Sequence, residues 1–227
     1  MKKIYPLLGV IASISYIIYV IVGGVLSDGE YSHLTNAISE LPYFVPQDSF
    51  IWLGKLTIIY RSSLAFFSII AFMDFKKYKS TICRIAFLLV LFNSLVGMMM
   101  TFISMDVRES QITFIGIRYV VVTGFSLIFS ILPPLFIGIG VKNIVKFRHL
   151  TIYSMISSLI IFISGCISAV GAVNEYIYFG VFERITIGTY IIWILVVSMN
   201  ILFSNIATAN LEKYLKKQGG MYIVKKR

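Results

Sequence analysis

The sequence predicts an all-α integral membrane protein, a bundle of about six transmembrane helices with both termini in the cytoplasm. Of its 227 residues, 58% are hydrophobic and only 13% are charged, whereas a soluble domain carries roughly a quarter charged residues. The apolar residues gather in long runs, and a run of about 18 or more is typical of a membrane span. Short basic clusters separate these runs. The length suits one compact bundle without a separate soluble domain.

Each apolar run is long enough to cross a bilayer as a helix. The first run begins after Lys2 and Lys3. We interpret it as a retained helix, because the apolar region of a signal peptide spans only about 7–15 residues. The predicted helices cover residues 4–26, 51–73, 85–105, 112–141, 152–173 and 185–206, and a basic cytoplasmic tail covers residues 208–227.

The distribution of Lys and Arg predicts the orientation of the chain. Fifteen of the 20 Lys and Arg lie in the N-terminus, the 75–84 loop, the 142–150 loop and the tail. Loops rich in Lys and Arg stay on the cytoplasmic side. We therefore predict a multi-pass protein of the plasma (inner) membrane, with the acidic 27–50 segment outside. The net charge of +10 then indicates contact with anionic membrane lipids, and its clustering argues against nucleic acid as a partner.

Three basic residues fall within the predicted helices. A charge at the centre of a span costs about 2.5–3.5 kcal/mol on insertion scales, so such residues face the bundle interior or extend to the interface. Lys55 lies one turn from the end of its helix, and its side chain can reach the interface. Arg61 lies about ten residues in, roughly 15 Å deep, and Arg118 is at intermediate depth. We expect both arginines to point inward.

These arginines and polar residues of the predicted outer side form one candidate ligand-binding site. Guanidinium groups bind phosphate or carboxylate groups bidentately. One hypothesis is therefore a polar cavity that opens to the outer leaflet and holds a lipid headgroup or small anion. The other hypothesis is a set of buried Arg–carboxylate pairs that lock the helices together. The residues of this candidate site are Ser39, Glu40, Arg61, Asp106, Arg118, Glu183 and Arg184.

Few residues suit catalysis or cofactor binding. The two histidines, His33 and His149, are too few for the three or four ligands of a zinc site, and the sequence has no glycine-rich phosphate loop. We therefore predict no metal and no cofactor. Ser39, His33 and Asp106 allow a Ser–His–Asp arrangement, although any serine-rich chain allows such a selection. The sequence argues more against an enzyme than for one.

Three motifs resemble those of a bacterial six-helix membrane family, domain-of-unknown-function family 998. They are YSHLTNAISELP after the first helix, a polar turn with Asp106 after the third, and GVFERI at the start of the sixth. The family is similar in architecture to the Frag/DRAM/Sfk membrane proteins. The resemblance spans about residues 5–207. It points to Ser39, Glu40, Leu41, Asp106 and Arg184.

Four functions follow from these observations. The first is a non-enzymatic protein that binds a lipid headgroup or small anion. The second is a membrane-embedded lipid hydrolase or transferase. The third is a small transporter or permease-like component, although the chain shows no inverted repeat of the kind that secondary transporters use. The fourth is a structural or partner-binding role. The intramembrane arginines and the scarcity of catalytic groups favour the first.

Overall fold

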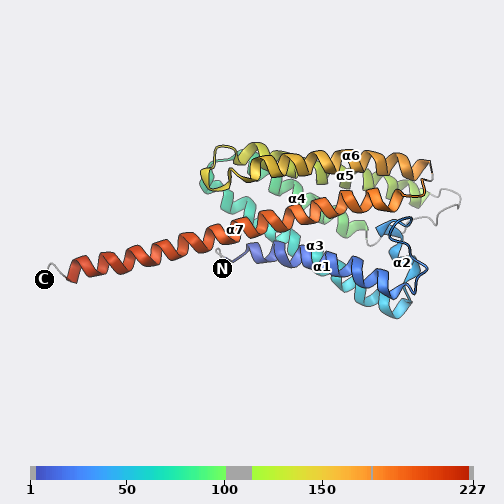
Figure 1. Cartoon of the computed structure of the whole chain (residues 1–227), viewed down its shortest axis with the longest axis horizontal. Helices are drawn as coiled ribbons and strands as arrows, with labels where there is room; N and C mark the ends of the chain where they lie inside the picture. Colours follow the sequence, from blue (N-terminus) through green and yellow to red (C-terminus); the bar gives the residue numbers. More distant parts are fainter. Residues whose placement is uncertain (1–3, 101–113, 175, 225–227) are drawn as a thin grey trace.

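The computed structural model describes residues 4–100, 114–174 and 176–224, and within these ranges it contains helices and no strand. The long helices follow the apolar runs of the sequence (Figure 1). They are α1 Pro6–Leu26, α3 Gln47–Asp74, α4 Thr81–Met100, α5 Phe114–Val141, α6 Leu150–Val173 and α7 Phe179–Val224. The short elements are η1 Ile38–Glu40, α2 Leu41–Phe44, η2 Phe75–Tyr78 and η3 Val145–Phe147.

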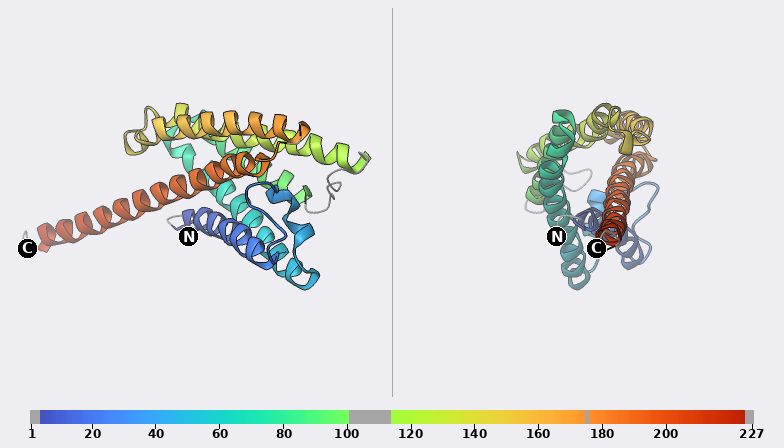
Figure 2. Two further views of the ribbon diagram at one scale, coloured as in Figure 1. Left: turned by 45° about the vertical axis from the view of Figure 1, so that its right-hand side comes forward. Right: turned by 90° about the vertical axis from the view of Figure 1, so that its left-hand side faces the viewer.

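The six long helices close into a ring. Each packs against the next one along the chain, and α7 also packs against α1. The right-hand view of Figure 2 shows this ring end-on. Short connections favour such an order, because helices joined by few residues become antiparallel neighbours. The chain enters α1 and leaves along α7 at one end of the ring, and the connection from α1 to α3 lies at the other end (Figure 1).

The outer surface of the ring is apolar, and polar side chains lie inside it. On α1, Ile14, Ile21 and Val25 are exposed, whereas Ser13 is completely buried. Ser94 of α4 is also completely buried. Soluble monomers rarely expose continuous apolar surface of this extent. Six of the described helices are long and apolar enough to cross a membrane, which confirms the prediction of a multi-pass helical bundle.

Aromatic side chains fill the ring toward the end where the chain begins. Phe75 of η2 stacks on Phe147 of η3, with ring centroids 5.7 Å apart, and contacts Phe87 of α4 at 4.9 Å. Trp193 of α7 is completely buried, and its indole N–H donates to the Ser154 hydroxyl at 3.0 Å. Because lipid is as apolar as these side chains, their contribution to stability is close packing rather than removal from water.

Several helices extend beyond the apolar runs that predict them, and α4, for example, begins at Thr81 rather than near residue 85. α3 begins at Gln47 rather than near residue 51, because Pro46 suits the position before a helix and Asp48 in the first turn favours the helix dipole. α7 continues to Val224 rather than ending near residue 206 and projects beyond the ring (Figure 1). The residues that follow 206 include Ala, Leu, Glu and Lys, which are good helix formers.

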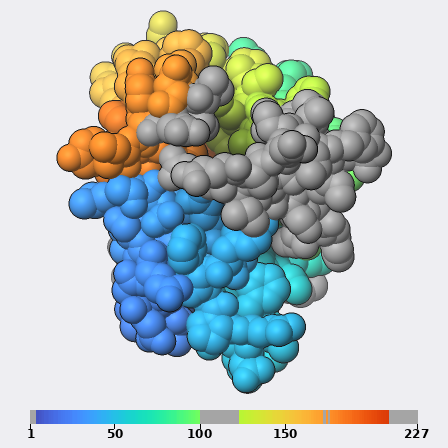
Figure 3. Space-filling view, turned by 90° about the vertical axis from the view of Figure 1, so that its right-hand side faces the viewer, coloured from blue at the N-terminus to red at the C-terminus, as the bar shows by residue number. Residues whose placement is uncertain are grey.

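Residues 27–46, here called the connector, link α1 to α3 and contain η1 and α2. The connector turns sharply at Asp28 and Gly29, whose φ angles are 48° and 84°. It then folds back over the end of the ring, where Leu41 is completely buried and packs against Gly23 of α1. Figure 3 shows this end of the molecule, with the connector (blue) against the start of α7 (orange). The connector therefore places its polar residues beside the first turns of α7.

Candidate functional site

The Glu183 carboxylate, near the start of α7, accepts hydrogen bonds from the connector. Its Oε2 accepts the Ile38 backbone N–H, and its Oε1 accepts the Ser39 hydroxyl at 3.4 Å. The first N–H groups of a helix have no acceptor within that helix, so Glu183 supplies an acceptor to η1 from another element. Two residues of the predicted site, Ser39 and Glu183, are thus in contact across 144 positions of sequence.

The Arg184 guanidinium forms a second link between α7 and the connector. Its Nη1 donates to the Asn36 carbonyl at 2.7 Å and to the Gly180 carbonyl at 2.8 Å, and its Nη2 donates to the Tyr31 hydroxyl. The Tyr31 hydroxyl in turn donates to the Ala37 carbonyl at 2.9 Å. Hydrogen bonds to a charged group contribute about 1.5–3 kcal/mol each. Arg184 therefore fastens the connector to α7 through neutral oxygen atoms rather than through a carboxylate.

Glu40 lies within the connector and bonds to its own segment. It is buried, and its Oε2 accepts the Ala37 backbone N–H at 2.8 Å and the Asn36 side-chain amide at 3.3 Å. The bond from Ala37 is one half of a capping box, because the Ala37 methyl group cannot accept the return bond, and it stabilises the start of η1. The structure thus brings Ser39, Glu40, Glu183 and Arg184 into one cluster, here called the docking cluster.

The Ser–His–Asp arrangement is not assembled in the part of the chain that the structure describes. The Ser39 hydroxyl donates to Glu183, and no hydrogen bond within that part joins it to His33. The His33 ring instead packs edge-on against Tyr31, with centroids 5.3 Å apart. Burial and the charge of Arg184 lower the pKa of His33, so its imidazole is mainly neutral at pH 7. Asp106 lies outside the described residues.

Arg61 lies in a second polar cluster, deeper in the ring. Its Nη1 donates to the Asn93 side-chain and backbone oxygens at 3.3 and 3.4 Å, and its guanidinium carbon lies 4.7 Å from the Tyr60 ring centroid. The Asn93 amide donates to the Ser130 hydroxyl at 2.8 Å and the Ser126 carbonyl at 3.3 Å. These two acceptors on α5 fix the orientation of the amide, so its oxygen faces Arg61.

The compensation of the Arg61 charge is weak. Among the described residues, no carboxylate lies within 4.0 Å of the guanidinium, and only Nη1 has a hydrogen-bond acceptor. Lys55 differs, because its ammonium lies 3.7 Å from the centroid of the exposed Trp52 ring, outside the ring of helices. Arg118 belongs to α5, but its side chain lies outside the described residues. Arg61 therefore keeps unused donors inside the ring, and Arg184 keeps one, its buried Nε.

Three tyrosines accompany Arg61 inside the ring. Tyr60 of α3 lies against the guanidinium, and Tyr190 of α7 belongs to the same buried core, against which Tyr16 of α1 packs. The Tyr16 and Tyr60 rings are in contact, with centroids 4.9 Å apart. The Tyr16 ring also contacts Tyr19 of α1, with centroids 5.9 Å apart. We call Tyr16, Tyr60, Arg61, Asn93 and Tyr190 the inner cluster.

Sequence reasoning missed the partners of the arginines. Asn93 carried a usable signal, since an amide inside an apolar run must find a hydrogen-bond partner. Tyr31 and Asn36 are ordinary loop residues by sequence, and Tyr16 and Tyr190 are indistinguishable from packing aromatics. Only the closure of α1 against α7 brings these residues together.

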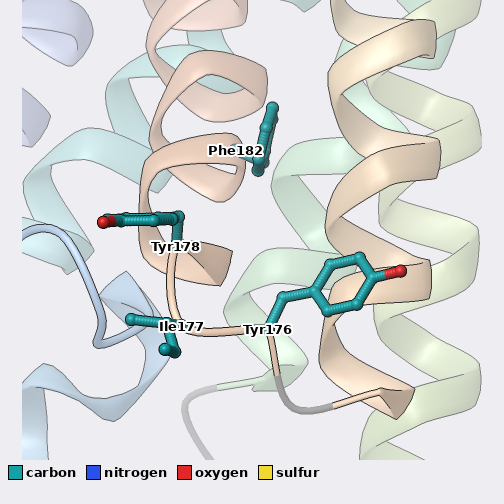
Figure 4. Close-up of a pocket in the computed structure, with 4 residues that line it drawn as sticks. All are labelled: Tyr176, Ile177, Tyr178 and Phe182. Atoms are coloured by element: carbon teal, nitrogen blue, oxygen red, sulfur yellow. The ribbon is translucent and has the colours of Figure 1, made fainter.

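A shallow pocket of about 370 Å³ lies beside the docking cluster at the start of α7. Tyr176, Ile177, Tyr178 and Phe182 line it. Tyr176 and Phe182 extend toward α6, and Tyr178 extends to the opposite side (Figure 4). The lining is apolar and aromatic, and it includes none of the predicted site residues. This pocket is therefore a feature of the apolar rim and not the polar cavity expected from the sequence.

No family model, curated protein or solved structure matches this chain. The resemblance of its motifs to domain-of-unknown-function family 998 therefore stays a prediction.

Proposed function

We propose that this membrane protein binds an anionic group, a lipid headgroup or a small anion, at Arg61 inside the helix ring. The observation that carries the proposal is the weak compensation of this charge. The guanidinium has five N–H donors, and the described residues offer acceptors to Nη1 alone, at 3.3 and 3.4 Å. A charge within a membrane bundle is costly unless it is paired, and an anionic ligand supplies the missing partner.

The docking cluster supports this assignment because the contacts of its arginine, Arg184, differ from those of Arg61. Arg184 is fastened to carbonyl and hydroxyl oxygens at short distances, so its role is to hold the connector. Tyr19 packs in the cluster that contains Tyr31 of the connector, and the Tyr16 ring contacts both Tyr19 and the Tyr60 ring beside Arg61. Polar side chains thus lead from the connector end of the ring toward Arg61. We propose this end as the route of access for the ligand.

Native mass spectrometry of the protein purified in mild detergent, with lipid extraction in parallel, tests the proposal. We expect one retained anionic species in the wild type that is lost in Arg61→Ala and weakened in Arg61→Lys, which keeps the charge but not the planar fork. Lys55→Gln is the matched control, because Lys55 is a cation of the same helix that lies over the exposed Trp52 ring. Retention of the same species by Arg61→Ala would show that the ligand binds elsewhere.

The proposed orientation places the connector outside the plasma (inner) membrane and both termini in the cytoplasm. The start of α1 and the extension of α7 lie at one end of the ring (Figure 1), and the basic loops of the sequence belong to that end. A cysteine introduced at Leu34, which is exposed in the connector, should react with a membrane-impermeant maleimide in intact cells when Cys166 is replaced by serine. Labelling only after permeabilisation would reverse the orientation.

A further inference from the structure

We infer that the anionic ligand is a lipid, which enters the ring sideways between α1 and α7 when the connector moves aside. The inference rests on the proposed function and adds the chemical class of the ligand and its route. Two observations carry it: α1 and α7 separate toward the connector, and the connector places apolar side chains between them.

The helices α1 and α7 contact each other directly toward the end of the ring where the chain begins. The Ser13 hydroxyl of α1 donates to the Ile191 carbonyl of α7 at 3.2 Å. About one turn nearer that end, a Cβ at Gly9 would overlap the Ser198 side chain, so the two helices are close there. Figure 1 and the left-hand view of Figure 2 both show the helices moving apart from this contact toward the connector.

The connector fills the space between the two helices at the other end. A Cβ at Gly23 of α1 would overlap Leu41 of the connector, and a Cβ at Gly180 of α7 would overlap the connector's Asn36 carbonyl oxygen. In the same way, α2 packs against α1 and η1 packs against α7. Displacement of the connector therefore leaves α1 and α7 apart at this end, open to the surrounding lipid.

The part of the connector that lies between the helices is apolar. Ile38, Leu41 and Val45 are buried. They form one apolar cluster with Tyr19 of α1 and Leu53 of α3. A charged group without a partner is costly to bring into such surroundings, whereas a hydrocarbon chain is as apolar as the side chains that it replaces. The passage therefore suits the chain of a lipid better than a hydrated anion.

Aromatic contacts connect this passage to Arg61. The Tyr16 ring contacts the Tyr19 ring at 5.9 Å and the Tyr60 ring at 4.9 Å, measured between centroids. The Tyr60 ring lies 4.7 Å from the guanidinium carbon of Arg61. Along α1, Tyr16 lies about 10 Å from Gly23 at 1.5 Å per residue. A headgroup that reaches this depth can approach the guanidinium while its chains stay between α1 and α7.

The connector is built to move as a unit. Bonds within it, such as that from the Tyr31 hydroxyl to the Ala37 carbonyl at 2.9 Å, keep its shape. It begins at a sharp turn, where Gly29 has a φ angle of 84° that glycine adopts without steric cost. Glu183 and Arg184 hold it to α7 through hydrogen bonds, which can break and form again as a lipid enters.

Native mass spectrometry of the full-length protein in mild detergent tests the class of the ligand. The probes form two pairs with a shared headgroup, phosphatidylglycerol with glycerol phosphate and oleate with acetate. We expect the protein to retain at least one of the two lipids and neither of the chainless probes at the same concentration. Arg61→Gln should lose the retained lipid. Lys55→Gln should keep it, because Lys55 lies over the exposed Trp52 ring outside the ring of helices.

The outcomes separate this inference from the proposed function. If glycerol phosphate or acetate binds as well as the lipid of its pair, and Arg61→Gln abolishes that binding, the lipid assignment is wrong and the anion site stands. If Arg61→Gln retains the same probes as the wild type, or if the wild type binds none of them, both fail.

Cross-linking tests the route. Phosphatidylglycerol and oleate with a photoreactive group at the end of the chain should label α1 within residues 19–26 and α7 within residues 179–187, which flank the connector. Labelling that avoids both segments would overturn the route.

Release of the connector tests its part in entry. A Cβ at Gly180 displaces the Asn36 carbonyl from Arg184. Gly180→Ala should therefore speed the exchange of bound lipid for an isotope-labelled copy about tenfold, the effect of one lost hydrogen bond to a charged group. Gly188→Ala is the control in the same helix, since a Cβ there meets nothing within 4 Å. Equal exchange in the two variants, with folding verified by a thermal scan, would mean that the lipid enters elsewhere. If Gly180→Ala does not fold, the cross-links decide the route.

Discussion

Replacement of Gly180 by alanine should release the connector from α7 and lower the free energy of unfolding by about 2–4 kcal/mol. A Cβ atom at this position would overlap the backbone carbonyl oxygen of Asn36 and approach the Arg184 guanidinium. Backbone atoms cannot rotate away as the end of a side chain can. The Asn36 carbonyl must therefore move, and its 2.7 Å bond to Arg184 must break. Overpacking and the loss of charge-assisted hydrogen bonds act in the same direction.

Gly188→Ala is the matched control, because it lies in the same helix and a Cβ there meets nothing within 4 Å. This variant should be neutral or more stable, since alanine favours a helix over glycine by about 1 kcal/mol. Unfolding is measured by a thiol-reactive dye in a Cys166→Ser background, where Cys83 is buried. The protease Glu-C should cut the connector at Glu30 faster in Gly180→Ala. Equal melting temperatures and equal cutting in the two variants would contradict the proposed docking.

Replacement of Gly97 by alanine should displace the Arg61 guanidinium and destabilise the protein by about 1.5–3 kcal/mol, the contribution of a hydrogen bond to a charged group. A Cβ at Gly97 of α4 would overlap the guanidinium carbon. The arginine must then leave its position beside Asn93, where its Nη1 bonds at 3.3 and 3.4 Å. We also expect this variant to lose the anionic species that the wild type should retain in native mass spectrometry.

A double-mutant cycle assigns this effect to Arg61. In an Arg61→Ala background the overlap disappears, so Gly97→Ala should become nearly neutral, and the interaction energy between the two sites should equal most of the loss. Gly54→Ala serves as the control in α3, because a Cβ there meets nothing within 4 Å. An equal loss of stability with and without Arg61 would mean that the guanidinium does not lie against Gly97.

The architecture could be predicted from the sequence because the bilayer restricts the possible structures. A chain with long apolar runs must satisfy its backbone within each span, and helices do so. The predicted runs therefore coincide with the helices, and the differences concern their ends. Gln47 begins α3 earlier than hydropathy indicates, because a polar first turn is a feature of helix capping and not of membrane depth.

The site could be predicted only in part, for a different physical reason. A charged residue within an apolar run is easy to recognise, because its burial in a membrane is costly, and Arg61 stands out in the sequence for this reason. The groups that bond to the charged residues are uncharged, such as the hydroxyl of Tyr31 and the carbonyl of Asn36, which bond to Arg184. The sequence does not mark such groups, because their positions depend on the fold. The sequence left two hypotheses open for Arg184, a ligand cavity or a buried pair with a carboxylate. Arg184 instead holds the connector.

The closure of the ring by α7 has a consequence for biosynthesis. The chain is made from its N-terminus, so α1 and α3 enter the membrane well before α7 exists. During this interval α7 and its Tyr190 are absent from the ring around Arg61, and the connector lacks its partners Glu183 and Arg184. The early helices therefore present polar groups to lipid until the last helix arrives. A ribosome-bound chain arrested before residue 179 should accordingly cross-link to membrane insertases for longer than the finished protein. The ring is complete only after α7 has been inserted.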